Sequence, residues 1–200
     1  MYPIAFEKQY TRFVKQEFLT IAKAFIDDIE KALKRELVHD SAGIRADSIT
    51  NLMVLLQKLK EEYGNKVDIK TLQSKVAKHF SLVDAWSRDK TYESIKKLYA
   101  QTVTTEVGGK PFIPVVPLRK TLNEELINSA VRRNVELIND IYKNYFNDIT
   151  AVVKNGIMNG DGFNAITQQI QKKTNASMAK AQFWVRDQIG KFFGQTTKIR

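Results

Sequence analysis

The chain has no cysteine, and histidine and proline are scarce, with two and four residues among 200. The absence of thiols excludes disulfide bonds and thiolate metal sites. His39 and His79 occur singly, with no partner at metal-ligand spacing. We therefore expect no metal and no other cofactor, and we interpret both histidines as ordinary surface or interface residues.

Long apolar runs are also missing. No stretch approaches the roughly 18 consecutive apolar residues that a membrane span requires, and Glu7, Lys8, Arg12 and Lys15 interrupt the apolar residues near the N-terminus. We expect neither a signal peptide nor a membrane anchor. The composition, 43% hydrophobic and 27% charged, is that of an ordinary globular protein.

The sequence lacks the motifs of common enzyme classes. Gly108-Gly109-Lys110 has neither the preceding glycine nor the following hydroxyl of a phosphate-binding loop. The segment 159–162 has two glycines but not the alternating ligands and final glutamate of a calcium loop. Because no acid, base and nucleophile form a recognisable set, we predict that this protein is not an enzyme.

Charge is unevenly distributed along the chain, whose net charge is +10. Residues 1–150 carry 24 basic and 20 acidic side chains, whereas residues 151–200 carry eight and two. A basic excess of this kind favours contact with nucleic acid, and a solvated surface is the alternative. The candidate DNA contacts are Lys172, Lys173, Lys180, Arg186, Lys191, Lys198 and Arg200.

Apolar residues recur at three- and four-residue steps through the first hundred residues, which is the helical period. The pattern predicts helices at about 4–38, 48–64, 68–86 and 89–101. Short polar turns separate them, and no alternating pattern typical of strands competes. The sequence therefore predicts an all-α protein, an elongated multi-helix bundle.

Residues 102–118 differ from the rest because they contain three of the four prolines. Proline fixes φ and removes a backbone donor, so this segment is expected to be extended. It divides the chain into an N-terminal helical lobe, 1–101, and a C-terminal helical lobe, 119–200. Its apolar side chains are candidates for contact with a neighbouring subunit or, alternatively, for packing over the chain's own core: Phe112, Ile113, Val115 and Val116.

The C-terminal lobe is predicted to start with a capping box, Thr121 and Glu124, and a helix that extends to about Lys154. Apolar residues cover more than one face of this helix, so its aromatic residues Tyr142, Tyr145 and Phe146 are further protein-interface candidates. Three glycines are expected to end it and open a turn: Gly156, Gly160 and Gly162. A short helix at 163–170 and a last helix from Thr174 or Asn175 are expected to follow.

The order of residues in this lobe resembles a known family. The pattern comprises Asn134-x-x-Leu137-Ile138-x-x-Ile141, Tyr145-Phe146, Val153-x-x-Gly156 with the Gly160 turn, Ile166 and Ile170, and Arg186-Asp187-Gln188-x-x-Lys191 followed by Gly194. Over roughly residues 120–200 it is similar to the helical domain of the bacteriophage minor head proteins, the head morphogenesis family that includes the Mu F-like proteins. Within it, Asp187 and Lys191 stand at the spacing of a helical ion pair.

The resemblance implies a structural protein of the phage head that acts in head assembly. It would be assembled in the host bacterial cytoplasm and bound at the portal vertex. It further implies contact with the portal protein, with other capsid proteins or with copies of itself. Nonspecific contact with double-stranded DNA, linked to packaging or delivery of the genome, is implied in some members. Family members commonly continue into a further domain, so we expect these residues to be part of a longer protein.

The alternative function is that of a DNA-binding regulator. Residues 163–172 and 175–195 would then form a helix-turn-helix with a basic second helix. The second helix has few side chains spaced to read base edges. Contact with phosphates, independent of sequence, fits these residues better.

Overall fold

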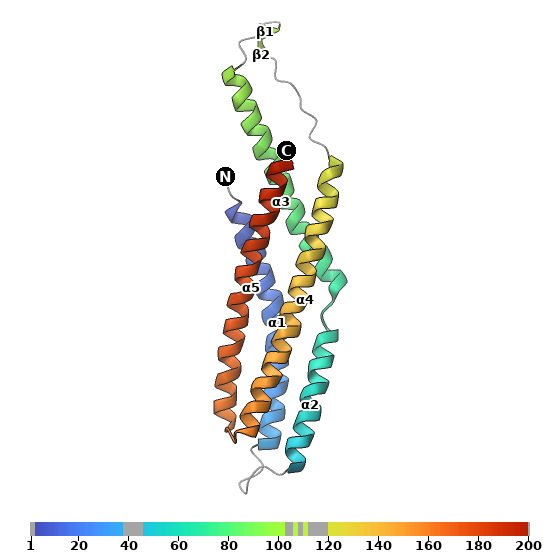
Figure 1. Ribbon diagram of the computed structural model, residues 1–200, viewed down its shortest axis with the longest axis vertical. Coiled ribbons are helices and arrows are strands. Elements are labelled where there is room, and N and C mark those ends of the chain that lie inside the picture. The colour runs from blue at the N-terminus through green and yellow to red at the C-terminus, as the bar shows by residue number, and fades with distance from the viewer. Residues whose placement is uncertain (1–2, 38–45, 103–105, 108–109, 112–119, 200) are drawn as a thin grey trace.

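The computed structural model describes residues 3–37, 46–102, 106–107, 110–111 and 120–199. These residues form five helices, α1 (Ile4–Leu37), α2 (Ala46–Asn65), α3 (Ile69–Thr102), α4 (Lys120–Met158) and α5 (Phe163–Ile199). Two strands of two residues each, β1 (Glu106–Val107) and β2 (Lys110–Pro111), pair antiparallel. The predicted all-α bundle is confirmed (Figure 1).

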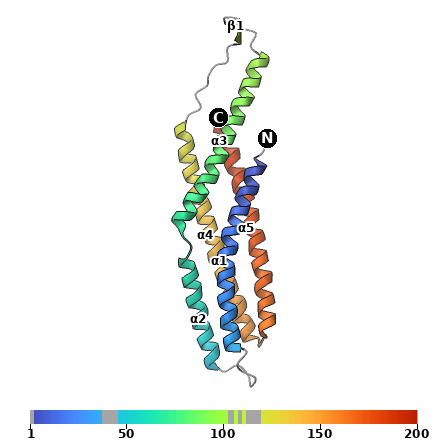
Figure 2. The same ribbon diagram turned by 180° about the vertical axis from the view of Figure 1, so that it is seen from behind.

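The helices form an elongated four-column bundle in which one column is shared by two helices. Helix α5 packs against both α1 and α4. On the other side, α2 packs between α1 and α4 in one half of the bundle, and α3 takes this position in the other half (Figures 1 and 2). Helix α3 then extends beyond the ends of α1 and α5.

The junction between α2 and α3 is made by a helix cap. The Asp68 carboxylate accepts hydrogen bonds from the Thr71 backbone N–H at 3.1 Å and from the Thr71 hydroxyl at 2.7 Å. Side-chain oxygens at this position satisfy backbone donors that the first turn leaves free. These hydrogen bonds lower the pKa of Asp68. The cap therefore fixes the start of α3, four residues after α2 ends at Asn65.

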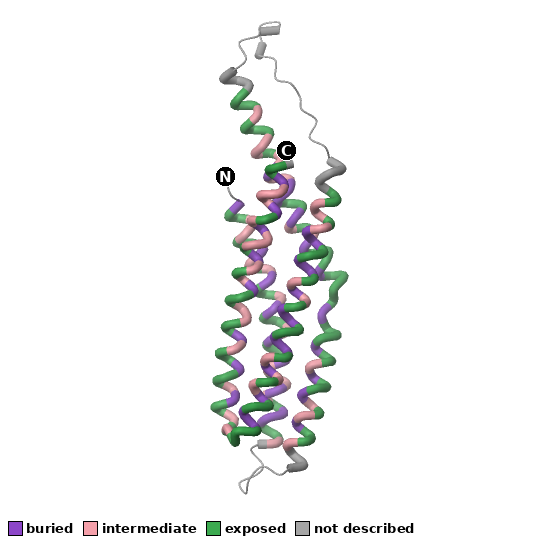
Figure 3. Tube along the Cα trace, viewed as in Figure 1, coloured by how far each residue is buried: buried purple, intermediate pink, exposed green. Residues whose placement is uncertain are grey.

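One hydrophobic core contains residues from both sides of the connector at 102–118. On α1, Phe25 lies 4.8 Å from Phe146 of α4 and 5.3 Å from Tyr63 of α2, measured between ring centres. Phe18 of α1 lies 4.9 Å from Tyr145 of α4. The buried positions face the inside of the bundle along most of its length (Figure 3). The segments 1–101 and 119–200 thus share a core.

Tyr142, Tyr145 and Phe146 are core residues, and the prediction that they form a protein interface is wrong. Their exposed fractions are 2%, 1% and 2%. Burial raises the pKa of Tyr145 to about 12. The sequence correctly indicated that α4 is buried on several sides, but the covering helices, α1, α2, α3 and α5, belong to the same chain.

Three buried hydrogen bonds join different helices. The Tyr10 hydroxyl donates to the Asn134 side-chain oxygen at 3.3 Å, which connects α1 to α4. The hydroxyls of Tyr145 and Thr174 lie 3.0 Å apart, and the Thr196 hydroxyl donates to Ser87 at 3.3 Å. Because a buried polar group without a partner costs about 1–3 kcal/mol, these pairs favour one longitudinal register of the helices.

Two predicted interruptions of helices are absent from the structure. Helix α3 continues through 86–89, and α5 continues from Phe163 to Ile199 without a break at Thr174. Neither junction contains a proline or a glycine. Polar residues with a capping tendency can remain inside a helix when their side chains bond to the preceding turn. The Thr174 hydroxyl does so, donating to the Ile170 carbonyl at 2.9 Å.

The turn between α4 and α5 depends on two glycines with different roles. Gly160 has a φ of 75°, in the left-handed region that favours glycine. Gly156 does not end α4 as predicted but lies within its last turn. A Cβ atom at Gly156 would lie 2.7 Å from Cγ1 of the buried Ile166 on α5. Gly156 therefore permits the close approach of the two helices.

Substitution of two helical glycines by alanine is expected to change stability in opposite directions. Gly156→Ala should lower the free energy of unfolding by about 1–2 kcal/mol, because the added methyl group displaces Ile166. Gly194→Ala should raise it by about 0.5–1 kcal/mol, because the added Cβ would meet no atom within 4 Å apart from its chain neighbours and its own helix backbone, and alanine favours the helix. Urea unfolding of both variants would test this, and two changes of the same sign would contradict it.

The contact between α1 and α2 contains a charge-assisted hydrogen bond. The buried Tyr63 hydroxyl donates to an Asp28 carboxylate oxygen at 2.6 Å. This bond, followed by that from Lys31, lowers the pKa of Asp28. A depressed carboxyl pKa stabilises the fold above the pKa of the unfolded state, about 3.9, and this stabilisation disappears as the pH falls through the folded-state pKa.

Tyr63→Phe is therefore expected to destabilise the protein by about 1 kcal/mol near neutral pH, since the ionised carboxylate loses its donor. The difference from the wild type should shrink as the pH falls through the lowered pKa of Asp28, because the carboxyl then becomes protonated. Tyr145→Phe is the matched control, because its partner Thr174 is uncharged. Urea unfolding at several pH values would measure both. A Tyr63→Phe effect as independent of pH as that of the control would contradict the prediction.

Candidate nucleic-acid interface

The basic side chains of α5 divide into two rows. Lys172 and Arg186 are 14 residues apart, close to four helical turns, and share one face of the helix. Lys173, Lys180, Lys191 and Lys198 share another. Arg186 bonds Glu7 of α1 at 2.9 Å, whereas Lys173 lies 3.1 Å from Asp148 of α4. The candidates predicted from the sequence thus do not form a single patch.

The row on the α4 side is largely engaged with neighbouring groups. Lys173 pairs with Asp148, and Lys191 pairs with Asp187 at 2.6 Å, which confirms the predicted ion pair. Gln188 donates to the same Asp187 carboxylate at 3.4 Å. The Lys180 ammonium lies 4.8 Å from the centre of the Trp184 ring. Carboxylates neutralise part of this charge, so this row is the weaker place for a phosphate.

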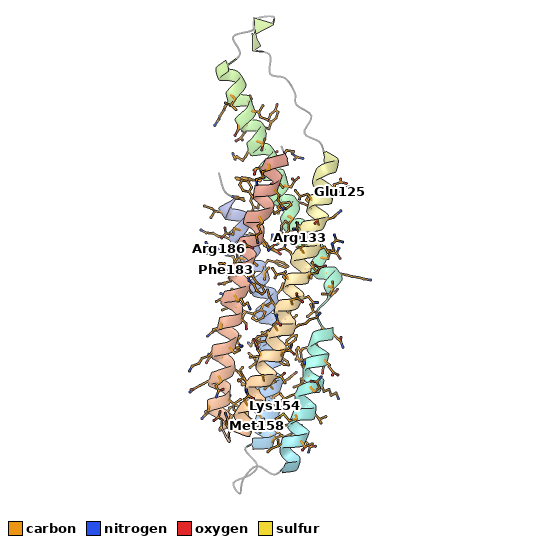
Figure 4. All side chains as sticks on the ribbon, viewed as in Figure 1. Glu125, Arg133, Lys154, Met158, Phe183 and Arg186 are labelled. Atoms are coloured by element: carbon orange, nitrogen blue, oxygen red, sulfur yellow. The ribbon has the colours of Figure 1, made fainter. Side chains whose placement is uncertain are left out.

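A groove of about 540 Å³ lies between α1 and α5. Lys8, Thr11 and Arg12 line it from α1, and Ala179, Gln182, Phe183 and Arg186 line it from α5, with Glu7 at its edge. Figure 4 places Phe183 and Arg186 on adjoining turns of α5. Both side chains are 69% exposed. The groove therefore combines several cations with one open aromatic ring.

Helix α1 contributes cations that the sequence did not single out. Lys8, Arg12, Lys15 and Lys23 recur at helical steps on one face of α1, and all four are exposed. The nearly balanced charge of residues 1–150 concealed them. The helical wheel of residues 4–37 would have shown them, because it separates this face from most of the acidic residues.

The acidic residues in this part of the two helices are already engaged. Residues 7–23 contain two, Glu7 and Glu17, and residues 172–186 contain none. Glu7 bonds Arg186, and Glu17 bonds Lys75 of α3 at 2.7 Å on another side of α1. We define the α1–α5 basic surface as Lys8, Arg12, Lys15, Lys23, Lys172 and Arg186. Its positive charge suits a polyanion.

Arg200 and the apolar residues of the connector, Phe112, Ile113, Val115 and Val116, lie outside the described residues. Lys198 is exposed in the last turn of α5, on the row away from the α1–α5 basic surface.

Apart from the charged side chains, the part of the chain that the structure describes offers few groups that could take part in catalysis or metal binding. His79 is half-buried beside Tyr10 and Phe13, with ring centres 5.3 and 5.0 Å away. Burial, followed by the charge of Lys78, lowers its pKa. No group of three His, Cys, Asp or Glu side chains there could hold a metal ion. None of the helices in those ranges is apolar over a long enough stretch to span a membrane.

The structure rules out the predicted helix-turn-helix. Residues 163–172 and 175–195 lie in one continuous helix, α5. A recognition helix must leave a turn at a large angle to enter the major groove, and no such turn exists here. The regulator hypothesis in that form is wrong.

Several residues of the family-like pattern are buried and hold the helices together. Asn134 is buried and donates to the Ala130 carbonyl while it accepts from Tyr10. Ile138, Ile141 and Ile170 lie in the core. Searches of protein-family models, curated proteins and solved structures found no match to the chain. The resemblance to phage minor head proteins therefore rests on the residues given above.

If the α1–α5 basic surface binds polyanions, removal of a positive charge from this surface should weaken binding more than removal of one elsewhere. Arg12→Gln should elute from a heparin column at lower salt than the wild type, because one fewer counterion is released per lost contact. Arg132→Gln is the matched control: Arg132 is also exposed but lies on α4, one turn from Glu136. Equal shifts for the two variants would show that total charge, and not this surface, determines retention.

Proposed function

We propose that this protein is a structural minor head protein of a tailed bacteriophage, bound at the portal vertex, that contacts DNA without sequence preference. The observation that carries the proposal is the residue order from Asn134 to Gly194. The glycine turn in that order joins two long helices at close range. The α1–α5 basic surface supports the DNA contact independently.

The shape of the bundle suits a part that lies along its neighbours. Helices α1, α4 and α5 have 34, 39 and 37 residues. At 1.5 Å per residue, each is about 50–60 Å long. A rod of this kind presents extended sides with different chemistry. One side can face packaged DNA while another contacts the portal protein, other capsid proteins or a second copy.

The DNA contact follows from the distribution of charge. Each phosphate that a lysine or arginine neutralises releases a condensed counterion, which drives binding at low salt. The α1–α5 basic surface spans about 22 Å along α1 from Lys8 to Lys23, at 1.5 Å per residue. Lysine and arginine side chains on two packed helices grip phosphates but do not enter a groove to read bases. Binding is therefore expected without sequence preference.

The other sides of the bundle offer contacts for proteins. Exposed apolar side chains there include Val54 on α2, Tyr92 on α3 and Met158 on α4, with exposed fractions of 66%, 43% and 70%. These helices do not contribute to the α1–α5 basic surface. Contact with the portal protein on any of them leaves the cations free for DNA.

The proposal predicts co-purification with the portal protein when both are produced together. It also predicts that duplex DNA binds at low salt, that the affinity falls steeply with ionic strength, and that unrelated sequences bind equally. Pull-down and fluorescence anisotropy at several salt concentrations would measure the two parts. A chain that binds neither the portal protein nor DNA at low salt would overturn the proposal, and a preferred DNA sequence would contradict its second part.

A further inference from the structure

Phe183 is the most exposed aromatic side chain in the described part of the chain, with an exposed fraction of 69%. It stands on the wall of the groove between α1 and α5, beside Arg186 and opposite Lys8 and Arg12. The ring adds nothing to the core of this bundle. An open aromatic ring among cations is instead a combination that a ligand can use.

Three classes of ligand fit this surface to different extents. Duplex DNA would contact the cations through its phosphates, but its bases are stacked inside and would leave the ring unused. A partner helix would need a row of apolar anchors at steps of three or four residues, and the groove offers Phe183 and the small Ala179. A single strand uses both features, because its phosphates meet the cations and an unpaired base stacks on the ring.

The groove has the donors that a nucleotide requires. The Arg186 guanidinium uses its Nε–H for Glu7 at 2.9 Å, and a guanidinium has five N–H donors in all. The bond to Glu7 holds the group at the rim, while its exposure leaves it accessible to a phosphate. Lys8 and Arg12 approach from the other helix.

We propose that the α1–α5 basic surface binds single-stranded nucleic acid, with one base stacked on Phe183. Phosphates on either side of that base contact Lys8, Arg12 and Arg186. The inference rests on the proposed contact with DNA and adds to it a single-stranded form, which uses the ring as well as the cations. Stacking is indifferent to base identity, so the site has no sequence preference.

The test compares a thymidine oligonucleotide with a duplex of the same length by fluorescence anisotropy at fixed salt. Phe183→Ala should weaken binding of the single strand by about tenfold, which corresponds to the loss of one stacked base. Binding of the duplex should not change. Phe183→Trp should retain the affinity of the wild type, because it keeps an aromatic face. Met158→Ala, another exposed apolar residue on a different helix, is the control and should have no effect.

Each outcome separates the inference from the proposed function. If Phe183→Ala binds the single strand like the wild type, or weakens both DNA forms equally, the inference is wrong and the duplex contact stands. If neither form binds at low salt, the proposed DNA contact itself fails. If a polyglutamate peptide displaces the oligonucleotide and its own binding depends on Phe183, the groove is a protein-docking site and the inference is overturned.

Discussion

The packing of Phe25 on α1 against Phe146 on α4, with 4.8 Å between ring centres, is the contact on which the bundle depends. These helices are diagonal partners, and their rings meet at the bundle axis. Tyr63 from α2 closes on Phe25 from one side, while α5 packs against both diagonal helices from the other. The buried tyrosine and threonine hydroxyls then favour one register. Every surface described above is a consequence of this arrangement.

The helical period was sufficient to predict the fold class. It placed the first helix within one residue of its observed end, Leu37, and it indicated that α4 is buried on several sides. It could not say what covers α4, because periodicity describes the face of a helix and not its partner. The expected breaks in α3 and α5 were wrong for a related reason. Residues that cap helices can also lie inside a helix. In α3 and α5 the packing against neighbouring helices keeps the helix continuous at these residues.

The candidate site was only half predictable. The cations of α5 were apparent from the net charge of the last fifty residues. Those of α1 were not, because the acidic residues that balance them in the sequence, such as Glu17, lie on another side of the helix. The net charge of a segment adds acidic and basic residues together, whereas the helix places them on different faces. The fold also directs Lys173 and Lys191 toward carboxylates and leaves Lys8, Arg12 and Arg186 around a common groove. Phe183 was not singled out, although the helical period places it opposite the buried residues Val185 and Ile189.

The shared column has a mechanical consequence. In α1, α4 and α5 the backbone hydrogen-bond ladder runs without interruption along the bundle, whereas the fourth column changes helix between Asn65 and Ile69. A continuous helix resists bending along its whole length, and a column with a joint resists it only within each piece. At the joint, the fourth column is therefore held by side-chain packing and by the Asp68 cap of α3, and not by a continuous backbone ladder. Tyr63, two residues before the end of α2, connects this joint directly to the aromatic core through its contacts with Phe25 and Phe146.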